Sequence, residues 1–264
     1  MPRKTKTSQK ATHQSTHQSS QNQNQDPLKR NPHIRTTPTH IFFHSGPLSN
    51  WHPSTPPFPG HRALTLCLPD LDALGIPHPS PKSAVTRLIS SWSFTCGEQW
   101  MMAMKGWLFE DIPGLDSGVD ITDEEFEGVR AVALGTSEPS SESTLERAIW
   151  DSTVASVLRT RQPRVQKALG RRAEGFREDV WEFASEVIVI AGCVARAEVD
   201  NALREVYLAS GGRRFVEGSV RDRVWGVGLR WDSGEIEDEG NWRGRNRLGR
   251  CHDEAARVVK GSFV

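Results

Sequence analysis

The chain has 264 residues, of which 36% are hydrophobic, and its 33 Lys and Arg residues balance its 33 Asp and Glu residues. This composition excludes collagen-like, coiled-coil and disulfide-rich scaffolds. The longest apolar run, residues 187–195, is less than half as long as the roughly twenty residues that a membrane helix needs, so we expect a soluble protein with no membrane partner.

The first 39 residues form a basic tail rich in Gln, Ser and Thr. They bury too little apolar surface to offset the entropy of ordering, so the tail is predicted to be disordered. The four cysteines are far apart and form no C-x-x-C pair, which predicts neither a disulfide framework nor a metal site. Because the N-terminal segment lacks the apolar region of a secretory signal, the expected location is intracellular, in the cytoplasm or alternatively the nucleus.

The ordered domain is predicted to span residues 40–264 and to begin with a short strand at residues 41–43. A proline-dense loop follows. Residues 64–90 carry further prolines and are predicted to be a peripheral insertion that is helical only at 82–91. Gly97–Phe109 is predicted to be a helix, because Thr95 and Glu98 have the spacing of a capping box at its start.

A second insertion is predicted at residues 111–147, which hold ten acids and include one short helix at Asp123–Leu134. Apolar spacing and helix start and stop signals indicate the later elements. These are helices at 163–169, 180–191, 194–209 and 248–260 and a strand at Arg214–Glu217. The predicted fold is therefore α+β, a single and mostly helical domain with a few short strands.

Five motifs follow one another along the predicted domain, and both predicted insertions lie outside them. The motifs are Pro47-Leu48-Ser49-Asn50-Trp51 after Phe43, Gly97-Glu98-Gln99-Trp100-Met101-Met102-Ala103-Met104-Lys105, Leu169-Gly170-Arg171 with Phe176 and Trp181, Val216-Glu217-Gly218-Ser219 with Asp222 and Trp225-Gly226-Val227-Gly228, and Trp242 with Gly244, Asn246 and Leu248-Gly249. Taken in this order, they resemble the NADAR (YbiA-like) family.

The resemblance implies the fold and activity of an N-glycosidase. Members of this family hydrolyse N-glycosidic bonds in phosphoribosylamino-pyrimidine intermediates of riboflavin synthesis or in ADP-ribose attached to guanine. The expected partner is thus a phosphorylated ribosyl or ADP-ribosyl compound, including ADP-ribosylated nucleic acid, and no metal or organic cofactor is expected. The alternatives are a module that binds ADP-ribose without hydrolysing it and an interaction scaffold built on the basic tail and the acidic insertion.

Cleavage of such a bond needs charge stabilisation at the anomeric carbon and a proton for the departing amine. Glu98 and Lys105 are seven residues apart on the predicted helix, hence on one face and roughly 10 Å apart along its axis. The resemblance implies that Lys105 is catalytic, as a nucleophile whose amine is freed by burial, and that Glu98 stabilises the cationic sugar or activates water. From the sequence pattern alone, without the family resemblance, Glu98 would complete the capping box and Lys105 would be a solvated surface lysine.

Asp222 is the third catalytic candidate, as a general acid or a ribose-hydroxyl acceptor, with an Asx turn as its structural alternative. One ring of Trp100 and Trp225 is expected to stack on a nucleobase, and the other to be part of the core. The remaining binding candidates offer hydrogen bonds to the sugar, a phosphate partner, or close backbone approach. They are Ser49, Asn50, Asn246, Arg171, Gly226 and Gly228. The asparagines have loop-backbone bonding as their structural alternative.

Overall fold

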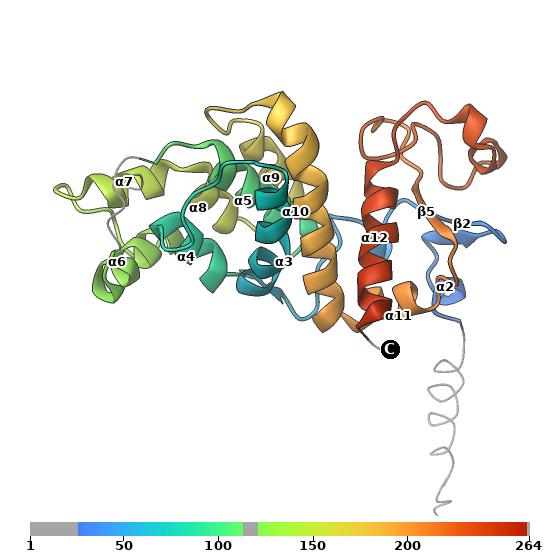
Figure 1. Cartoon of the computed structure of the whole chain (residues 1–264), viewed down its shortest axis with the longest axis horizontal. Coiled ribbons are helices and arrows are strands. Elements are labelled where there is room, and N and C mark those ends of the chain that lie inside the picture. Colours follow the sequence, from blue (N-terminus) through green and yellow to red (C-terminus); the bar gives the residue numbers. More distant parts are fainter. Residues whose placement is uncertain (1–25, 113–120, 263–264) are drawn as a thin grey trace, which may run out of the picture.

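Two long helices, α10 (Glu178–Val199) and α12 (Arg247–Gly261), lie side by side in the middle of the molecule (Figure 1). α3 (Gly60–Ala73) and α5 (Gly97–Phe109) pack against α10 on one side, and a small sheet lies on the other side, next to α12. The computed structural model describes residues 26–112 and 121–262. Within these two stretches, no helix combines the length and apolar character needed to cross a membrane.

The small sheet has three strands in the order β1 (Ile34–Thr36), β2 (His40–Phe43) and β5 (Arg214–Glu217). β1 runs antiparallel to β2, and β5 runs parallel to β2 with Glu217 opposite Phe43. Side chains alternate between the two faces of a strand, so Glu217 shares the face of Phe215, which is buried in the main core. The sheet therefore brings Glu217, at the end of β5, to the edge of that core.

Shorter elements surround this framework. β3 (Phe58–Pro59) and β4 (Ser93–Phe94) form an antiparallel pair. The other helices are α2 (Pro27–Arg30), η2 (Gly46–Leu48), α4 (Ala84–Ser91), α6 (Asp123–Leu134), α7 (Thr144–Asp151), α8 (Thr153–Leu158), α9 (Pro163–Gly170), α11 (Asn201–Leu208), η3 (Gly234–Glu237) and η4 (Glu239–Asn241). The predicted class, a mostly helical α+β domain with a few short strands, is confirmed.

The elements with the clearest local patterns are confirmed at the predicted positions. α5, α6 and β5 have the predicted bounds. β2 contains the predicted strand at residues 41–43, and α9 and α12 extend the predicted helices by one residue at one or both ends. These segments carry helix start signals or apolar runs that do not depend on distant parts of the chain.

Both predicted insertions contribute to the main core, so residues 64–90 are not peripheral as predicted. α3 packs along α10 and buries Leu64, Cys67 and Leu71, while α6 buries Phe126 and Val129. The prolines of residues 64–90 predict little helix before residue 82, yet α3 continues through Pro69. Residues 113–120 of the second segment lie outside the described residues.

The prediction of two helices at 180–191 and 194–209 is also corrected. α10 continues through Gly192 to Val199. The glycine allows α5 to approach closely, since a Cβ atom there would lie 2.4 Å from Trp100 Cδ1. The chain breaks instead at Asp200, whose Oδ1 accepts from the backbone N–H groups of Ala202 and Leu203 at the start of α11.

The described chain begins before the predicted boundary of the tail. Residues 26–39 include α2 and β1, and Leu28 and Ile34 are buried in the main core. Asp26 caps α2 by accepting from Leu28 N at 3.0 Å. Disorder of residues 26–39 is therefore not observed, and residues 1–25 lie outside the described residues.

Gly192→Ala is expected to lower the free energy of unfolding by about 1–3 kcal/mol, the usual effect of overpacking a rigid contact. The added methyl group would collide with Trp100, whose indole is fixed by a 2.7 Å hydrogen bond from Nε1 to the carbonyl oxygen of Ile188. Urea unfolding measures the effect. The matched control is Gly128→Ala in α6, where the neighbour within reach is the flexible Glu146 carboxylate and helix propensity predicts a gain of up to about 1 kcal/mol.

Candidate functional site

The candidate site is a cavity of about 500 Å³ between the start of α5, the end of α9 and the loop after β5. This volume is in the range of small-molecule sites. Six of the residues predicted from sequence line it, although they come from four separate parts of the chain. They are Ser49, Asn50, Glu98, Arg171, Asp222 and Trp225.

Glu98 is the buried carboxylic acid of this cavity. Its side chain lies in the first turn of α5 and is 2% exposed. Oε2 accepts from Trp51 Nε1 at 3.2 Å, whereas Oε1 is buried with no hydrogen-bond partner. Desolvation raises the pKa of Glu98 from 4.5 to about 7, with the positive charge of Lys167 acting in the opposite direction. A carboxyl group that titrates near neutral pH can exchange protons with a substrate.

The predicted capping box does not form, which removes the structural explanation for Glu98. The N-cap of α5 is Cys96, and its side chain makes no capping bond. Thr95 instead donates from its backbone N and its Oγ1 to Oε1 of Gln99, at 2.9 and 3.0 Å. Glu98 is fixed through its backbone, whose N–H donates to the carbonyl oxygen of Asn50 at 2.8 Å.

A second carboxylic acid, Glu217, lines the same cavity. Its Oε2 is buried and has no hydrogen-bond partner. Desolvation raises the pKa of Glu217 to about 8, and the negative charges of Asp222 and Glu98 add to this effect. Its backbone N–H donates to Oδ1 of Asn246 at 3.0 Å. The cavity thus holds two acids with pKa values close to neutrality.

Asp222 has one oxygen committed to the loop and one in the cavity. Oδ1 accepts from the backbone N–H groups of Val224 and Trp225 at 3.0 and 2.8 Å, which is the Asx turn considered from sequence. Oδ2 lies 4.0 Å from Nζ of Lys167, which also lines the cavity. Asp222 therefore orders the loop that carries Trp225 and holds a cation of α9 beside the acids.

Lys105 is not among the residues that line the cavity. Its Nζ lies 3.8 Å from the ring centroid of Phe176 and 5.6 Å from that of Trp181, in cation–π contacts. Burial lowers the pKa of Lys105, and the nearby charge of Arg171 lowers it further. Glu98 and Lys105 thus share helix α5, but the structure places only Glu98 in the cavity wall.

Four other predicted site residues lie outside the cavity wall. Trp100 is in the core, where it makes an edge contact with Phe94, so of Trp100 and Trp225 it is Trp225 that lines the cavity. Asn246 satisfies the backbone of β5: its Oδ1 accepts from Glu217 N at 3.0 Å, and its Nδ2 donates to the carbonyl oxygen of Phe215 at 2.9 Å. Gly226 and Gly228 pack against other segments of the same chain. A Cβ atom on Gly226 would lie 2.9 Å from the carbonyl oxygen of Glu217, and one on Gly228 would lie 3.1 Å from Cβ of Arg243.

Sequence reasoning missed several residues of the cavity, above all Trp51, Lys167, Glu217 and Arg221. Trp51 and Glu217 are part of the motifs, so their presence was noted but no role was assigned to them. Lys167 lies one helical turn before Arg171, and this i, i+4 spacing was the available signal for a second cation on the same face of α9. Burial of the carboxylates, which decides their chemistry, has no local signal.

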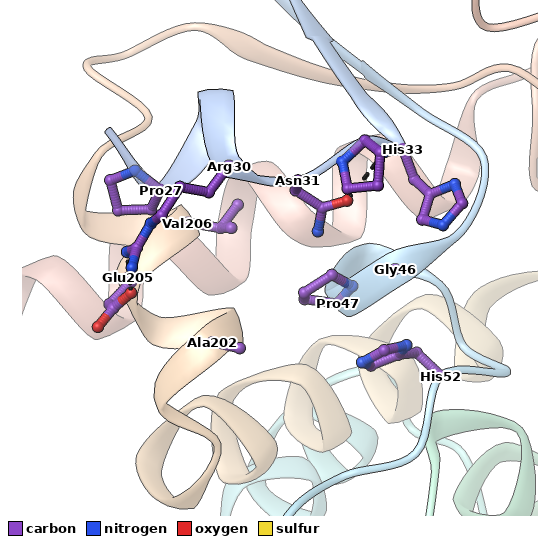
Figure 2. A pocket seen from close by; sticks show the side chains of 11 residues that line it. Pro27, Arg30, Asn31, His33, Gly46, Pro47, His52, Ala202, Glu205 and Val206 are labelled. Atoms are coloured by element: carbon purple, nitrogen blue, oxygen red, sulfur yellow. Dashed lines mark hydrogen bonds and ion pairs between the residues drawn. The ribbon is translucent and has the colours of Figure 1, made fainter. Parts of the chain in front are cut away.

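A second hollow, of about 420 Å³, lies between the N-terminal segment and α11 (Figure 2). Three of its polar side chains have partners: Arg30 bonds Glu205 at 2.8 Å, and Oδ1 of Asn31 accepts from His33 N at 2.9 Å. None of the unpartnered buried polar atoms of the described residues belongs to its lining. The cavity that contains Glu98 is therefore the better candidate for chemistry.

Glu98→Gln is expected to change how stability depends on pH. Between pH 4.5 and about 7 the folded state binds the Glu98 proton more tightly than the unfolded state, so the free energy of unfolding falls as the pH rises. Because Gln stays neutral, the variant should gain stability relative to the wild type by up to about 3 kcal/mol across this window. Urea unfolding at pH 4.5 and 7.5 measures the difference in the free energy of unfolding between the variant and the wild type. The same difference at both pH values would contradict burial of the Glu98 charge.

The family model of the NADAR domain matches residues 146–257. Protein irg-1 of Caenorhabditis elegans is 31% identical over 109 residues, which are 40% of this chain and 51% of that protein. N-glycosidase R617 of Acanthamoeba polyphaga mimivirus is 32% identical over 84 residues, which are 32% of this chain and 49% of that protein. The chain thus spans about half the length of these curated relatives.

Proposed function

We propose that this chain, whose residues 146–257 match the family model of the NADAR domain, is an N-glycosidase that hydrolyses the bond between ribose and an amine nitrogen. The match to a relative named N-glycosidase supports the reaction class. The observation that carries the proposal is Glu98, a buried carboxyl group with one unpartnered oxygen in a cavity of ligand size. A group of this kind serves acid–base chemistry at a sugar.

The proposed reaction is direct hydrolysis. The bond from C1′ to nitrogen breaks, its electron pair leaves with the amine, and positive charge develops on C1′ and the ring oxygen. The ionised form of Glu98 stabilises this charge and takes a proton from the attacking water. Trp51 supports the ionised form, because its Nε1–H donates to Oε2 of Glu98 and leaves Oε1 for the substrate.

The charges around the acids support a phosphorylated substrate. Lys167, Arg171 and Arg221 line the cavity on the α9 side and in the loop after β5, and guanidinium and ammonium groups bind phosphate oxygens. Trp225 offers a ring for stacking on a base. We propose as substrates a phosphoribosylamino-pyrimidine or ADP-ribose linked to guanine, the latter in a nucleotide or in nucleic acid, with Asp222 as acceptor for a ribose hydroxyl.

Two assays test this function. Purified protein is incubated with a phosphoribosylamino-pyrimidine and with an oligonucleotide that carries ADP-ribosylated guanine, and the released sugar phosphate is measured by mass spectrometry. Turnover of either compound is the expected result. Tight binding of ADP-ribose without turnover would instead indicate a module that binds ADP-ribose without hydrolysing it. Absence of both binding and turnover would contradict the proposal.

A lysine route through an imine is tested separately by borohydride reduction during turnover. Lys105 would have to leave the Phe176 ring to reach the cavity, so direct hydrolysis predicts an unchanged protein mass. An adduct mapped to Lys105 by peptide mass spectrometry would restore it as the nucleophile, as the family resemblance implied. An adduct on Lys167, which lines the cavity, would identify a different nucleophile.

A further inference from the structure

Two carboxyl groups in the cavity each leave one buried oxygen without a partner, Oε1 of Glu98 and Oε2 of Glu217. In the proposed direct hydrolysis, Glu98 acts on the attacking water, but no residue has yet been named that donates a proton to the departing amine. Glu217 is the acid that the mechanism does not yet use. It faces Glu98 of α5, Lys167 of α9 and Asp222 of its own loop, whose charges all act on it.

The position of Glu217 is fixed by hydrogen bonds of both its backbone N–H and its backbone carbonyl group. Its N–H donates to Oδ1 of Asn246, and its carbonyl oxygen accepts from Val227 N at 2.9 Å. Asn246 is itself buried and held in the left-handed region, with φ of 51°, and its Nδ2 donates to Phe215. The carboxyl group therefore projects into the cavity from a rigid strand end, as precise proton transfer requires.

The hydrogen bonds separate the roles of the three acids. Oε2 of Glu98 accepts a bond from Trp51, and Oδ1 of Asp222 accepts two bonds from backbone N–H groups. Donated hydrogen bonds stabilise a carboxylate, whereas a carboxyl group that receives none, is desolvated and lies near another negative charge keeps its proton. Of the acids that line the cavity, Glu217 is the one that fits the second description.

We propose that Glu217 is the general acid that protonates the departing amine nitrogen; this inference rests on the proposed N-glycosidase function. As the C1′–N bond breaks, the proton of Glu217 moves to nitrogen, which leaves as a neutral amine. Water adds to C1′ and gives one proton to Glu98. Transfer of that proton from Glu98 to Glu217 restores both groups, so the products are the amine and the free sugar.

The leaving group provides the test. Nitrophenolate departs without protonation, so an enzyme that lacks its general acid still cleaves 4-nitrophenyl ribofuranoside 5-phosphate while it loses the amine substrate. Glu217→Gln is compared with Glu98→Gln and with Glu254→Gln, a control at an exposed carboxylate on α12 that pairs with Arg257. The readout is kcat/KM for the amine substrate and for the nitrophenyl compound.

Glu217→Gln is expected to lower kcat/KM for the amine substrate by about 10²–10⁴-fold and for the nitrophenyl compound by less than about tenfold. Glu98→Gln should lower both, and Glu254→Gln neither. Equal losses on both substrates, or no loss on either, would overturn the role of Glu217. Absence of turnover by the wild-type protein on both compounds would instead overturn the N-glycosidase function itself, so the two failures are distinguishable.

Discussion

Glu98→Gln is expected to lower kcat by about 10²–10⁴-fold while the affinity for substrate changes little. Gln keeps the size of the side chain and still accepts the bond from Trp51, but it can neither balance positive charge at C1′ nor take a proton from water. Single-turnover kinetics with either proposed substrate measure the loss. Equilibrium binding of the same compound to the variant measures the affinity.

The matched control for this substitution is Glu124→Gln. Glu124 also lies in the first turn of a helix, α6, but its side chain is exposed. Full activity of Glu124→Gln together with loss in Glu98→Gln would assign the effect to the cavity rather than to helix stability. Turnover by Glu98→Gln within about threefold of the wild-type rate would contradict a catalytic role.

Asn246→Ala is expected to lower the free energy of unfolding by about 2–5 kcal/mol, which is a large effect for one polar side chain. The side chain is 2% exposed and satisfies two backbone groups of β5, the N–H of Glu217 and the carbonyl oxygen of Phe215. Removal leaves both buried groups without a partner. The alanine also has to adopt the left-handed φ that asparagine tolerates better.

Chemical denaturation of Asn246→Ala beside Asn241→Ala tests this. Asn241 is exposed in η4, where its Nδ2 donates to the carbonyl oxygen of Glu235 at 3.1 Å, so its removal should change stability by less than about 1 kcal/mol. Equal effects of the two substitutions would show that Asn246 does not hold β5. Loss of activity in Asn246→Ala at a temperature where it remains folded would support its part in positioning Glu217.

Local signals explain why some elements could be predicted from the sequence. α6 has a capping box of Thr122 and Glu125 at its start and ends at Gly135 with φ of 72°, and both signals are visible in the sequence. β5 contains the apolar pair Phe215 and Val216 and lies between Gly212 and Gly218. Where such signals mark both ends of an element, the predicted bounds agree with the structure.

The errors arise where distant contacts override local rules. The predicted break between residues 191 and 194 is absent: α10 runs through Gly192, whose missing side chain leaves the space that Trp100 of α5 occupies. Pro69 resembles a helix breaker, yet burial of Leu64, Cys67 and Leu71 against the main core stabilises α3 around it. Each of these decisions depends on residues far away in the chain, so composition alone could not reveal them.

The candidate site shows the same division. The motifs identified Glu98, and the spacing to Lys105 on one helix was correct. The sequence could not predict the direction of the Lys105 side chain, because the Phe176 and Trp181 rings that it contacts come from a later part of the chain. The second acid was overlooked for a related reason: Glu217 becomes an acid with a raised pKa only when β5 closes the cavity beside Glu98.

Titration of the Glu98 carboxyl group tests the account most directly. Carbon-13 NMR of protein labelled at the glutamate side chains follows each carboxyl signal with pH, and the signal missing from Glu98→Gln identifies this residue. We expect that signal to titrate near pH 7, with a second high transition from Glu217 that shifts in the variant, because the two acids interact. A Glu98 signal that titrates near its ordinary value of 4.5 would show a solvated carboxylate and contradict the proposed chemistry.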